Sequence, residues 1–373
     1  AAAGATLLLV LALTLAACGS SDDAPAGARE VKVSLTDAGC SPSKLDLPAG
    51  PTTFHVTNDG TSKVSEFEVL SGKRILGERE NVVEGIDGGS FTLNLKPGTY
   101  TLACPGGDSA ASGVLTVSGD SGAAEAATRD ARLTAATAGY TSYVETQARE
   151  LQRRVRTFAR AVKSGDVAEA KRRFAWARAP YETIEPVAES FGGLDPRIDA
   201  RVNDVAQGDR WTGFHRIEQG LWQKNSTAGL RPYADRLVAD VDELTTKVKG
   251  LSYEPEELAN GANGLLGEVS ASKITGEEDR YSHTDLADFE ANVLGSQAAF
   301  ALLAPAVKER DPQLAATVTA RFKRVLAALE PYRRGSGFVS YDTVTEAQRR
   351  ELSQQVDALA EPLSEVAGVL QQR

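Results

Sequence analysis

The sequence predicts a multidomain protein in which an all-β sandwich is followed by an all-α helical bundle. From about residue 31 to residue 117, apolar and polar residues alternate, which is the pattern of half-buried strands. Beyond residue 130, apolar residues recur at spacings of three and four, which is the pattern of amphipathic helices. A small, polar stretch at residues 120–130 separates the two patterns and reads as a linker. With 373 residues, the chain is long enough for two domains.

The N-terminal residues predict export. The apolar run from Leu7 to Ala17 is too short to span a bilayer but has the length of a signal-peptide core, so we expect residues 1–17 to be removed. The run ends in Leu15-Ala16-Ala17-Cys18, a lipoprotein cleavage pattern. We therefore expect a lipid on Cys18, a tether over residues 18–29, and a protein anchored to the cell membrane that faces the periplasm or the cell surface. The alternative is ordinary cleavage with a free Cys18.

The first domain, residues 30–119, contains short strand patterns separated by turn signals such as Pro97-Gly98. The strand patterns cover residues 31–35, 45–47, 54–56, 67–69, 91–95, 100–102 and 114–117. The second domain, residues 131–373, contains almost no strand signals. Its helical patterns cover residues 140–162, 167–179, 232–248, 284–307, 311–329 and 345–370.

Charge and cysteine content narrow the classes of function. The net charge of −10 argues against a nucleic-acid partner, which would require a basic face. If Cys18 is lipidated, Cys40 and Cys104 remain as a pair in an oxidising compartment, where a disulfide is the common outcome. Methionine is absent and there are three histidines, so few soft or imidazole ligands exist for a metal.

The sharpest chemical signal is a His-x-x-Glu pair in the helical domain. On a helix, His215 and Glu218 share a face, so both can reach one ion. An imidazole nitrogen with carboxylate oxygens suits iron, zinc or manganese, and suits copper less specifically. A pair at this spacing is weak evidence by itself, since an ordinary satisfied polar pair has the same pattern.

Acidic residues elsewhere in the domain strengthen the metal interpretation, because helical bundles build metal sites from inward-facing carboxylates and histidines. Upstream, Glu182 and Glu185 repeat the three-residue spacing, and Asp199 adds a third carboxylate. Downstream, Glu278 lies in an acidic run that leads to His283. The bland alternatives are a solvated helix surface for the carboxylates and a capping or satisfied polar residue for His283.

Gly213-Phe214-His215-Arg216-Ile217-Glu218 matches the Gly-x-His-x-x-Glu motif of the imelysin-like family. Nearly the whole layout resembles the EfeO-type iron-uptake lipoproteins within it, which have a signal sequence, a cupredoxin-like domain and an imelysin-like helical domain in this order. The resemblance implies a helical bundle of two similar halves. It also implies an iron-binding protein that delivers iron to a membrane permease and works with a peroxidase-like partner. The family's old peptidase label does not by itself imply an enzyme.

A cupredoxin-like first domain would place Cys104 where that fold holds its copper cysteine. A blue-copper site also needs two histidines and usually a methionine, and the loop after Cys104 offers neither, so we reject that site. The resemblance leaves a weaker copper or iron site built from Cys40, Cys104, Glu66 and Glu68. A disulfide between the two cysteines is at least as well supported, and exposed strand carboxylates are the ordinary interpretation of the two glutamates.

Three functions compete at this point. The first is an iron-binding uptake component without enzymatic activity, in which zinc could occupy the same site. The second is a zinc-dependent peptidase, because His-x-x-Glu with a distant histidine also describes its ligand set. Such peptidases use an α/β scaffold, whereas the sequence after residue 130 predicts helices. A third reading makes the metal structural and has residues 149–178, rich in Arg and Lys, bind an anionic polymer.

Overall fold

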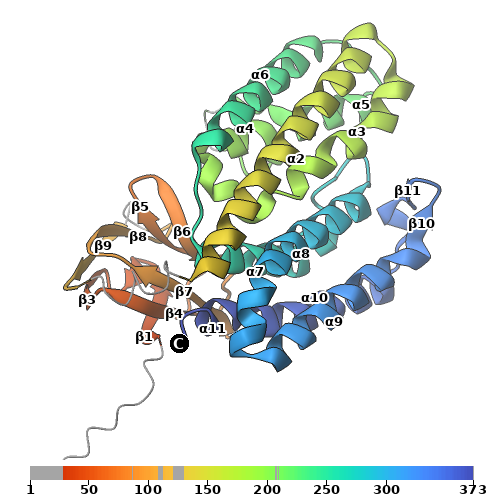
Figure 1. The fold of residues 1–373 in the computed structure, drawn as a ribbon. Helices are drawn as coiled ribbons and strands as arrows, with labels where there is room; N and C mark the ends of the chain where they lie inside the picture. Colours follow the sequence, from red (N-terminus) through yellow and green to blue (C-terminus); the bar gives the residue numbers. More distant parts are fainter. Residues whose placement is uncertain are drawn as a thin grey trace, which may run out of the picture.

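The computed structural model describes residues 28–85, 87–107, 112–120, 130–205, 208 and 210–372. The expected signal peptide, the lipidation site Cys18, almost all of the tether and residues 121–129 of the linker lie outside these residues. Within them, an N-terminal β domain precedes a helical domain, as the sequence predicts (Figure 1). The β domain lies against α7 and α11 of the helical domain.

The β domain is a sandwich of two sheets. One sheet has the order β2-β1-β4-β7 and the other has the order β3-β9-β8-β5-β6. β1 pairs with β4 in parallel, and β3 pairs with β9 in parallel, so each sheet is mixed. The strands are β1 (Arg29–Thr36), β2 (Gly39–Ser41), β3 (Lys44–Pro48), β4 (Gly50–Asn58), β5 (Phe67–Ser71), β6 (Arg74–Arg79), β7 (Asp87–Leu95), β8 (Gly98–Ala103) and β9 (Ser112–Ser118).

Alternating apolar residues of both sheets form the core of the sandwich. Phe54, Phe67 and Phe91 lie at its centre, with ring centroids 5.3 to 5.8 Å apart. Tilted and offset aromatic pairs at such distances add to the stabilisation from burial. Cys40 on β2 and Cys104 after β8 form a disulfide that ties the two sheets together.

The helical domain is arranged around the long helix α2, which contacts α3, α6 and α8. Its helices are α2 (Ala131–Ser164), α3 (Val167–Glu182), η1 (Glu185–Leu194), α4 (Asp195–Asp199), α5 (Gly213–Trp222), α6 (Arg231–Lys247), η2 (Val248–Gly250), α7 (Pro255–Ala271), η3 (Lys273–Thr275), α8 (Asp285–Arg310), α9 (Pro312–Leu329), η4 (Glu330–Tyr332), η5 (Tyr341–Thr343), α10 (Glu346–Ser364) and α11 (Val366–Val369). A short hairpin, β10 (Arg333–Arg334) with β11 (Gly337–Phe338), interrupts the helices.

Every predicted strand and helix is present, and the structure also contains strands and helices that the sequence pattern did not predict. The sequence pattern missed β2, β6 and α7. α7 contains Gly261, Gly264 and Gly267, which lower helix propensity and obscure the apolar pattern. Gly261 is required by packing, because a Cβ there would lie 1.8 Å from the carbonyl oxygen of Pro186. The missing side chain lets α7 approach η1 closely.

Direct hydrogen bonds and ion pairs join the two domains. Arg74 on β6 pairs with Glu257 of α7 at 2.9 Å and also donates to the Ser252 carbonyl oxygen at 2.7 Å. Asn260 of α7 donates to the carbonyl oxygen of Thr92 on β7 at 2.7 Å. These contacts make α7 the helix that holds the β domain against the bundle.

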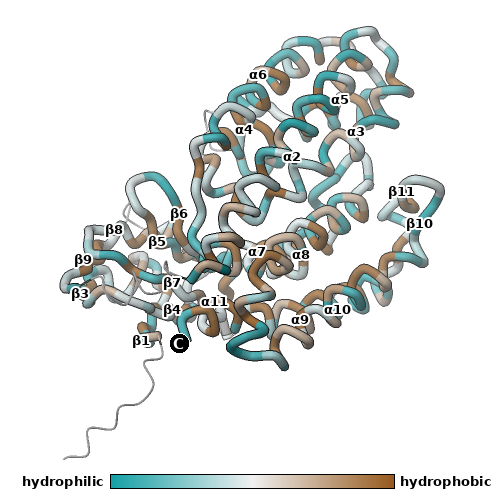
Figure 2. The backbone as a smooth tube through the Cα atoms, in the orientation of Figure 1, coloured by the Kyte–Doolittle hydropathy of each residue, from teal (hydrophilic) through white to brown (hydrophobic). Residues whose placement is uncertain are grey.

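Hydropathy follows this arrangement. Along the helices, hydrophobic and hydrophilic residues alternate around the axis, so that each helix has an apolar face for the core (Figure 2). Among the described residues, no helix is both long and apolar enough to cross a membrane.

Candidate metal centre

The loop before α5 places His215 beside Asp199. Gly213, the first residue of α5, has a φ of +83°, and a Cβ at this position would lie 2.2 Å from the Ile198 carbonyl oxygen. Only glycine fits both conditions. Thr212 fixes the same approach by donating from Oγ1 to the Arg197 carbonyl oxygen at 2.8 Å. The first residue of the motif therefore brings the start of α5 against the end of α4, which carries Asp199.

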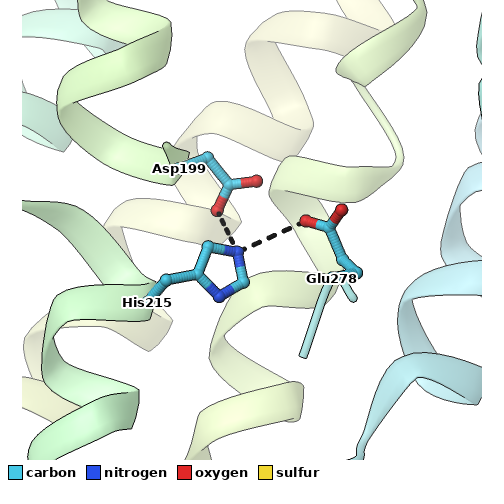
Figure 3. Close-up of side chains that lie close together, drawn as sticks. All are labelled: Asp199, His215 and Glu278. Carbon is cyan, nitrogen blue, oxygen red and sulfur yellow. Dashed lines mark hydrogen bonds and ion pairs between the residues drawn. The ribbon is translucent and has the colours of Figure 1, made fainter. Parts of the chain in front are cut away.

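Asp199 and Glu278 converge on the Nε2 atom of His215 in the interior of the helical domain. The Nε2 atom of His215 lies 3.7 Å from Asp199 Oδ1 and 3.3 Å from Glu278 Oε1 (Figure 3). These three ligand atoms lie within 4.8 Å of one another, and all three side chains are buried. One nitrogen and two oxygens at this separation are a suitable donor set for a borderline cation such as ferrous iron or zinc.

Glu218 lies on the other side of the imidazole ring. Its Oε2 atom is 2.9 Å from His215 Nδ1, and its Oε1 atom accepts backbone hydrogen bonds from Tyr281 at 2.8 Å and Ser282 at 2.7 Å. Both oxygens are therefore engaged. Carboxylates in this position orient a ligating histidine and increase its basicity. Glu218 is thus placed to hold the ring with Nε2 directed at Asp199 and Glu278.

Glu182 and Glu185 extend the cluster from the end of α3 and the start of η1. Pro186 is at the second position of η1, where the chain turns away from the axis of α3. Glu182 and Glu185 form a second group of potential ligands with Asp199, again within 4.8 Å. Asn292 on α8 donates to Glu182 at 3.0 Å and to Glu185 at 2.6 Å, and so holds the two carboxylates together.

Sequence reasoning missed the charged residues that complete the cluster. Arg178 and Lys273 are buried cations among the carboxylates, and Asp279 and Asp288 are two further buried acids. A signal for Asp288 existed, because Asp285 and Asp288 repeat at helical spacing at the start of α8, a helix whose middle is apolar. Arg178 gave no comparable signal, since it lies in a helix rich in exposed arginines.

The cluster holds more carboxyl groups than basic side chains. The carboxylates of Glu182, Glu185, Asp199, Glu218, Glu278, Asp279 and Asp288 surround Arg178, Lys273 and His215. Burial, followed by the charge of Glu218, raises the pKa of Asp279 to about 8, and burial also raises the pKa of Asp288. One oxygen of Asp279 and one of Asp288 are buried without a hydrogen-bond partner in the described part of the chain. A bound cation would relieve both conditions.

The same surroundings favour the protonated, positively charged form of His215. Burial and Arg178 lower the pKa of His215, but its hydrogen bonds to Glu218 and Glu278 and the charge of Asp199 raise it more, to about 10. Although burial opposes it, Lys273, His215 and Arg178 hold the pKa of Glu278 well below its usual range. A metal that binds through Nε2 must therefore displace a proton from His215.

His283 is not part of this cluster. It has a φ of +56°, and its backbone makes two hydrogen bonds: its N–H donates to the Asp279 carbonyl oxygen, and its own carbonyl oxygen accepts from the Tyr341 N–H. Among the described residues, His283 belongs to none of the groups of side chains that are close enough to share an ion. This histidine shapes the loop that carries Glu278 rather than offering a ligand there.

In the β domain, the two sulfur atoms are not free to bind a metal. Cys40 and Cys104 are joined by the disulfide, so the sulfur part of the expected copper or iron site is absent in this structure. His55, on the surface, pairs with Glu30. Glu66 and Glu68 converge instead with Glu78 of β6, and their carboxylate oxygens lie within 4.8 Å of one another.

A cavity between the domains leads to the cluster. It has a volume of about 660 Å³, and its walls include Glu66, Glu78 and Glu80 of the β domain. On the helical side, its walls include Glu185, Asp199 and Glu278 of the candidate centre. The buried ligand group is therefore reached from an acidic space that both domains form.

Known proteins resemble this chain in both of its domains. Residues 136–366 match the family model described as Imelysin, whose name also carries a peptidase label, and residues 6–117 match a cupredoxin-like domain. The "Iron uptake system component EfeO" of Escherichia coli O157:H7 is 43% identical over 346 residues, and that of strain K12 is 42% identical; each alignment covers 91% of both chains. Reduced rusticyanin aligns with 25% of this chain and 82% of its own length, at 19% identity and a TM-score of 0.20, a level that supports no further argument. The resemblance predicted from the motif is thus confirmed: the chain belongs to the imelysin family and, within it, to the EfeO proteins that join a cupredoxin-like domain to an imelysin domain.

Proposed function

We propose that this protein is the extracytoplasmic iron-binding component of an uptake system and that Asp199, His215 and Glu278 bind the iron. The observation that carries this proposal is the convergence of a buried imidazole nitrogen and two carboxylates in a cluster with more acidic than basic side chains. Relatives that cover 91% of the chain are named as iron-uptake components. Glu182 and Glu185 would supply further oxygen ligands, and Glu218 would position His215.

The cavity between the domains is the entry route in this proposal. Its acidic walls attract cations and raise their local concentration. Glu185, Asp199 and Glu278 belong both to these walls and to the ligand cluster, so a cation in the cavity is already in contact with its first ligands. The ion would leave by the same route for a membrane permease, and a peroxidase-like partner would act in the same system. A lipid on Cys18 would keep the protein at the membrane.

The proposed role is binding rather than catalysis. The alternative is a zinc-dependent peptidase that uses His215 and Glu218 as ligands. That mechanism needs an accessible zinc-bound water and a free carboxylate base. Both oxygens of Glu218 are occupied by His215 and by backbone N–H groups, which favours a positioning role for this residue. The relatives' names mention no enzymatic activity.

Metal content and peptide hydrolysis, measured on one preparation, test the two functions together. The metal-free protein is dialysed against ferrous iron without oxygen, ferric iron with a weak chelator, zinc and copper in turn, and is then assayed for bound metal. We expect about one iron per chain in the helical site, with zinc able to replace it. Hydrolysis of unstructured peptides that appears with zinc and is lost in His215→Ala would instead support the peptidase.

A further inference from the structure

Arg178 occupies the position where the proposed ion would sit. Its Nη1 atom lies 3.1 Å from His215 Nε2 and donates to Asp199, and its Nη2 atom lies 3.2 Å from Glu278 Oε1. These are the three residues of the candidate centre. The guanidinium is fully buried, and it lies over the rings of Phe174 and Phe214, at 5.8 and 5.4 Å. One resident side-chain cation therefore donates to both carboxylates of the candidate centre and lies against its imidazole nitrogen.

Lys273 has the corresponding position in the neighbouring carboxylate group. Its Nζ atom lies 2.6 Å from Glu185 Oε1, 3.6 Å from Glu182 Oε2 and 3.7 Å from Glu278 Oε2. The side chain is buried. Glu182 and Glu278 contact both cations, because each also contacts Arg178. Together, the two cations thus contact all the carboxylates that the proposed function assigns to iron.

These contacts stabilise the metal-free protein. A group of buried carboxylates without counter-ions is strongly unfavourable, and ion pairs with hydrogen bonds offset that cost. The same contacts oppose metal binding, since an oxygen that accepts from a guanidinium has less electron density to offer, and two cations a few ångströms apart repel each other in a poorly solvated site. The resident cations and an incoming metal therefore compete for one set of ligands.

We propose that Arg178 and Lys273 are displaceable internal counter-ions, which pair with the carboxylates of the cluster when it is empty. When a metal cation binds, Arg178 is pushed from Asp199, His215 and Glu278, and Lys273 is pushed from Glu185 and Glu278. This inference rests on the proposed function, because it concerns the same site. These counter-ions lower the affinity of the protein for the metal. They also favour release of the metal, because the Arg178 guanidinium can pair with the carboxylates again when the ion leaves. A protein that must pass its cargo to a permease needs such reversibility.

Arg178→Gln and Lys273→Gln test this directly in the full-length protein, with ferrous iron under nitrogen and zinc as the probes. Arg310→Gln is the matched control, because Arg310 pairs with Asp130 at 2.8 Å, is also largely buried, and has no contact with the cluster among the described residues. Loss of a competing charge should increase the affinity for each metal by at least about tenfold in both site variants. Their metal-free melting temperatures should fall, and saturating metal should raise them by more than it raises the parent's. Arg310→Gln should keep the parent's affinity.

Two different results would overturn this inference and the proposed function separately. If Arg178 and Lys273 only position the ligands, their variants bind metal as the parent does or more weakly, which overturns the inference while the metal site itself stands. If the parent binds no metal, or if His215→Ala binds metal as tightly as the parent does, the proposed function fails instead. Should Arg178→Gln fail to fold with or without metal, the affinity of Lys273→Gln relative to Arg310→Gln decides.

Discussion

His215 shows how its neighbours can dedicate one ring nitrogen to a ligand. Glu218 holds Nδ1 at 2.9 Å and is itself fixed by two backbone N–H groups, so Nε2 can point only toward Asp199 and Glu278. The Gly-x-His-x-x-Glu sequence contains this arrangement in compact form. Its glycine sets the approach of α5 to α4, its histidine supplies the nitrogen, and its glutamate orients the ring.

Replacement of Glu218 by Gln tests the orienting role. Glutamine retains a hydrogen-bond acceptor but removes the negative charge that favours a firmly held, basic imidazole. We expect iron and zinc affinity to fall roughly 10- to 100-fold, which is typical of groups that orient a metal ligand, with little change in helix content. Titration calorimetry and circular dichroism measure the two quantities. Glu346→Gln, at an exposed position, is the control, and an unchanged affinity in Glu218→Gln would remove this residue from the account.

Gly213→Ala tests the backbone requirement of the motif. At a φ of +83°, with the Ile198 carbonyl oxygen in the way, an alanine forces α5 away from α4 and costs about 1–3 kcal/mol or more. Urea unfolding measures the loss, and metal affinity should fall with it because His215 moves from Asp199. Gly250→Ala, where a Cβ meets no atom within 4 Å and φ is not positive, should stay within about 0.5 kcal/mol of the parent. Equal stability of the two variants would contradict the steric argument.

At the residue scale, the sequence predicted the carboxylates and the histidine of the candidate centre better than the cations that pair with them. His215, Glu218, Glu182, Glu185, Asp199 and Glu278 carry local spacing signals, and the structure brings them together. His283 has an equally suggestive context, but its backbone conformation commits it to a loop. Arg178 and Lys273 enter the cluster from α3 and η3, elements whose surroundings depend on the tertiary fold, and no local pattern reveals such a position.

At the scale of elements, α7 contacts both the β domain and the rest of the helical domain, yet the sequence pattern did not predict it. It contacts β6, β7, η1, α8 and α10. Gly261 allows the close approach to η1, and Gly264 and Gly267, which meet no atom within 4 Å, only weaken the helical signal. The helices that were predicted differ in this respect, since the long apolar and alanine-rich runs of α2, α8 and α9 are not broken by repeated glycines at short spacing. Gly261 thus explains the close contact between α7 and η1, and the three glycines together explain why the helix was not predicted.

The first turn of α7 also provides a test by pH. Burial is the main cause that raises the pKa of Glu256 to about 7, and Gln371 is its partner near the C-terminus. In the unfolded chain this group ionises near pH 4.5, whereas in the folded chain it keeps its proton to about pH 7. Its contribution therefore reduces the free energy of unfolding as pH rises from about 4.5 to 7, by up to roughly 3 kcal/mol. Glu256→Gln should remove that loss.

The measurement is urea unfolding of parent and Glu256→Gln at pH 5 and pH 8. The variant should be more stable than the parent at pH 8 by a larger margin than at pH 5. Glu346→Gln, at an exposed position at the start of α10, serves as the control and should not show this change with pH. Parallel pH profiles of parent and Glu256→Gln would show that the carboxyl is already ionised in the folded protein.

At the scale of the whole molecule, the two domains share a cavity while each has its own core. The order of a β sandwich and a helical bundle could be predicted because the period of the apolar pattern changes once along the chain. The cavity could not be predicted, since its acidic walls come from strands and helices far apart in the sequence. We expect residues 128–373 to fold and bind metal by themselves, because the ligand cluster lies within the helical domain.

The disulfide offers a second test at this scale. Simultaneous Cys40→Ser and Cys104→Ser replacement should destabilise the β domain by about 2–4 kcal/mol, because the bond closes a long loop. Iron and zinc affinity of the helical site should stay at the parent value. Thermal melts and metal titrations of this variant distinguish a structural bond from a metal site. A loss of bound copper or iron in the double variant would revive the metal interpretation of the cysteines.

The most direct test of the central claim is the affinity of His215→Ala for ferrous iron and zinc, measured by titration beside the parent at pH 6 and pH 8. We predict that the parent binds more tightly at pH 8, because the metal must displace the proton held by His215, and that His215→Ala loses at least about 100-fold in affinity while its helix content is retained. Parent-like affinity in His215→Ala, with only its melting temperature lowered, would make this histidine a structural residue and would contradict the assignment of the metal centre.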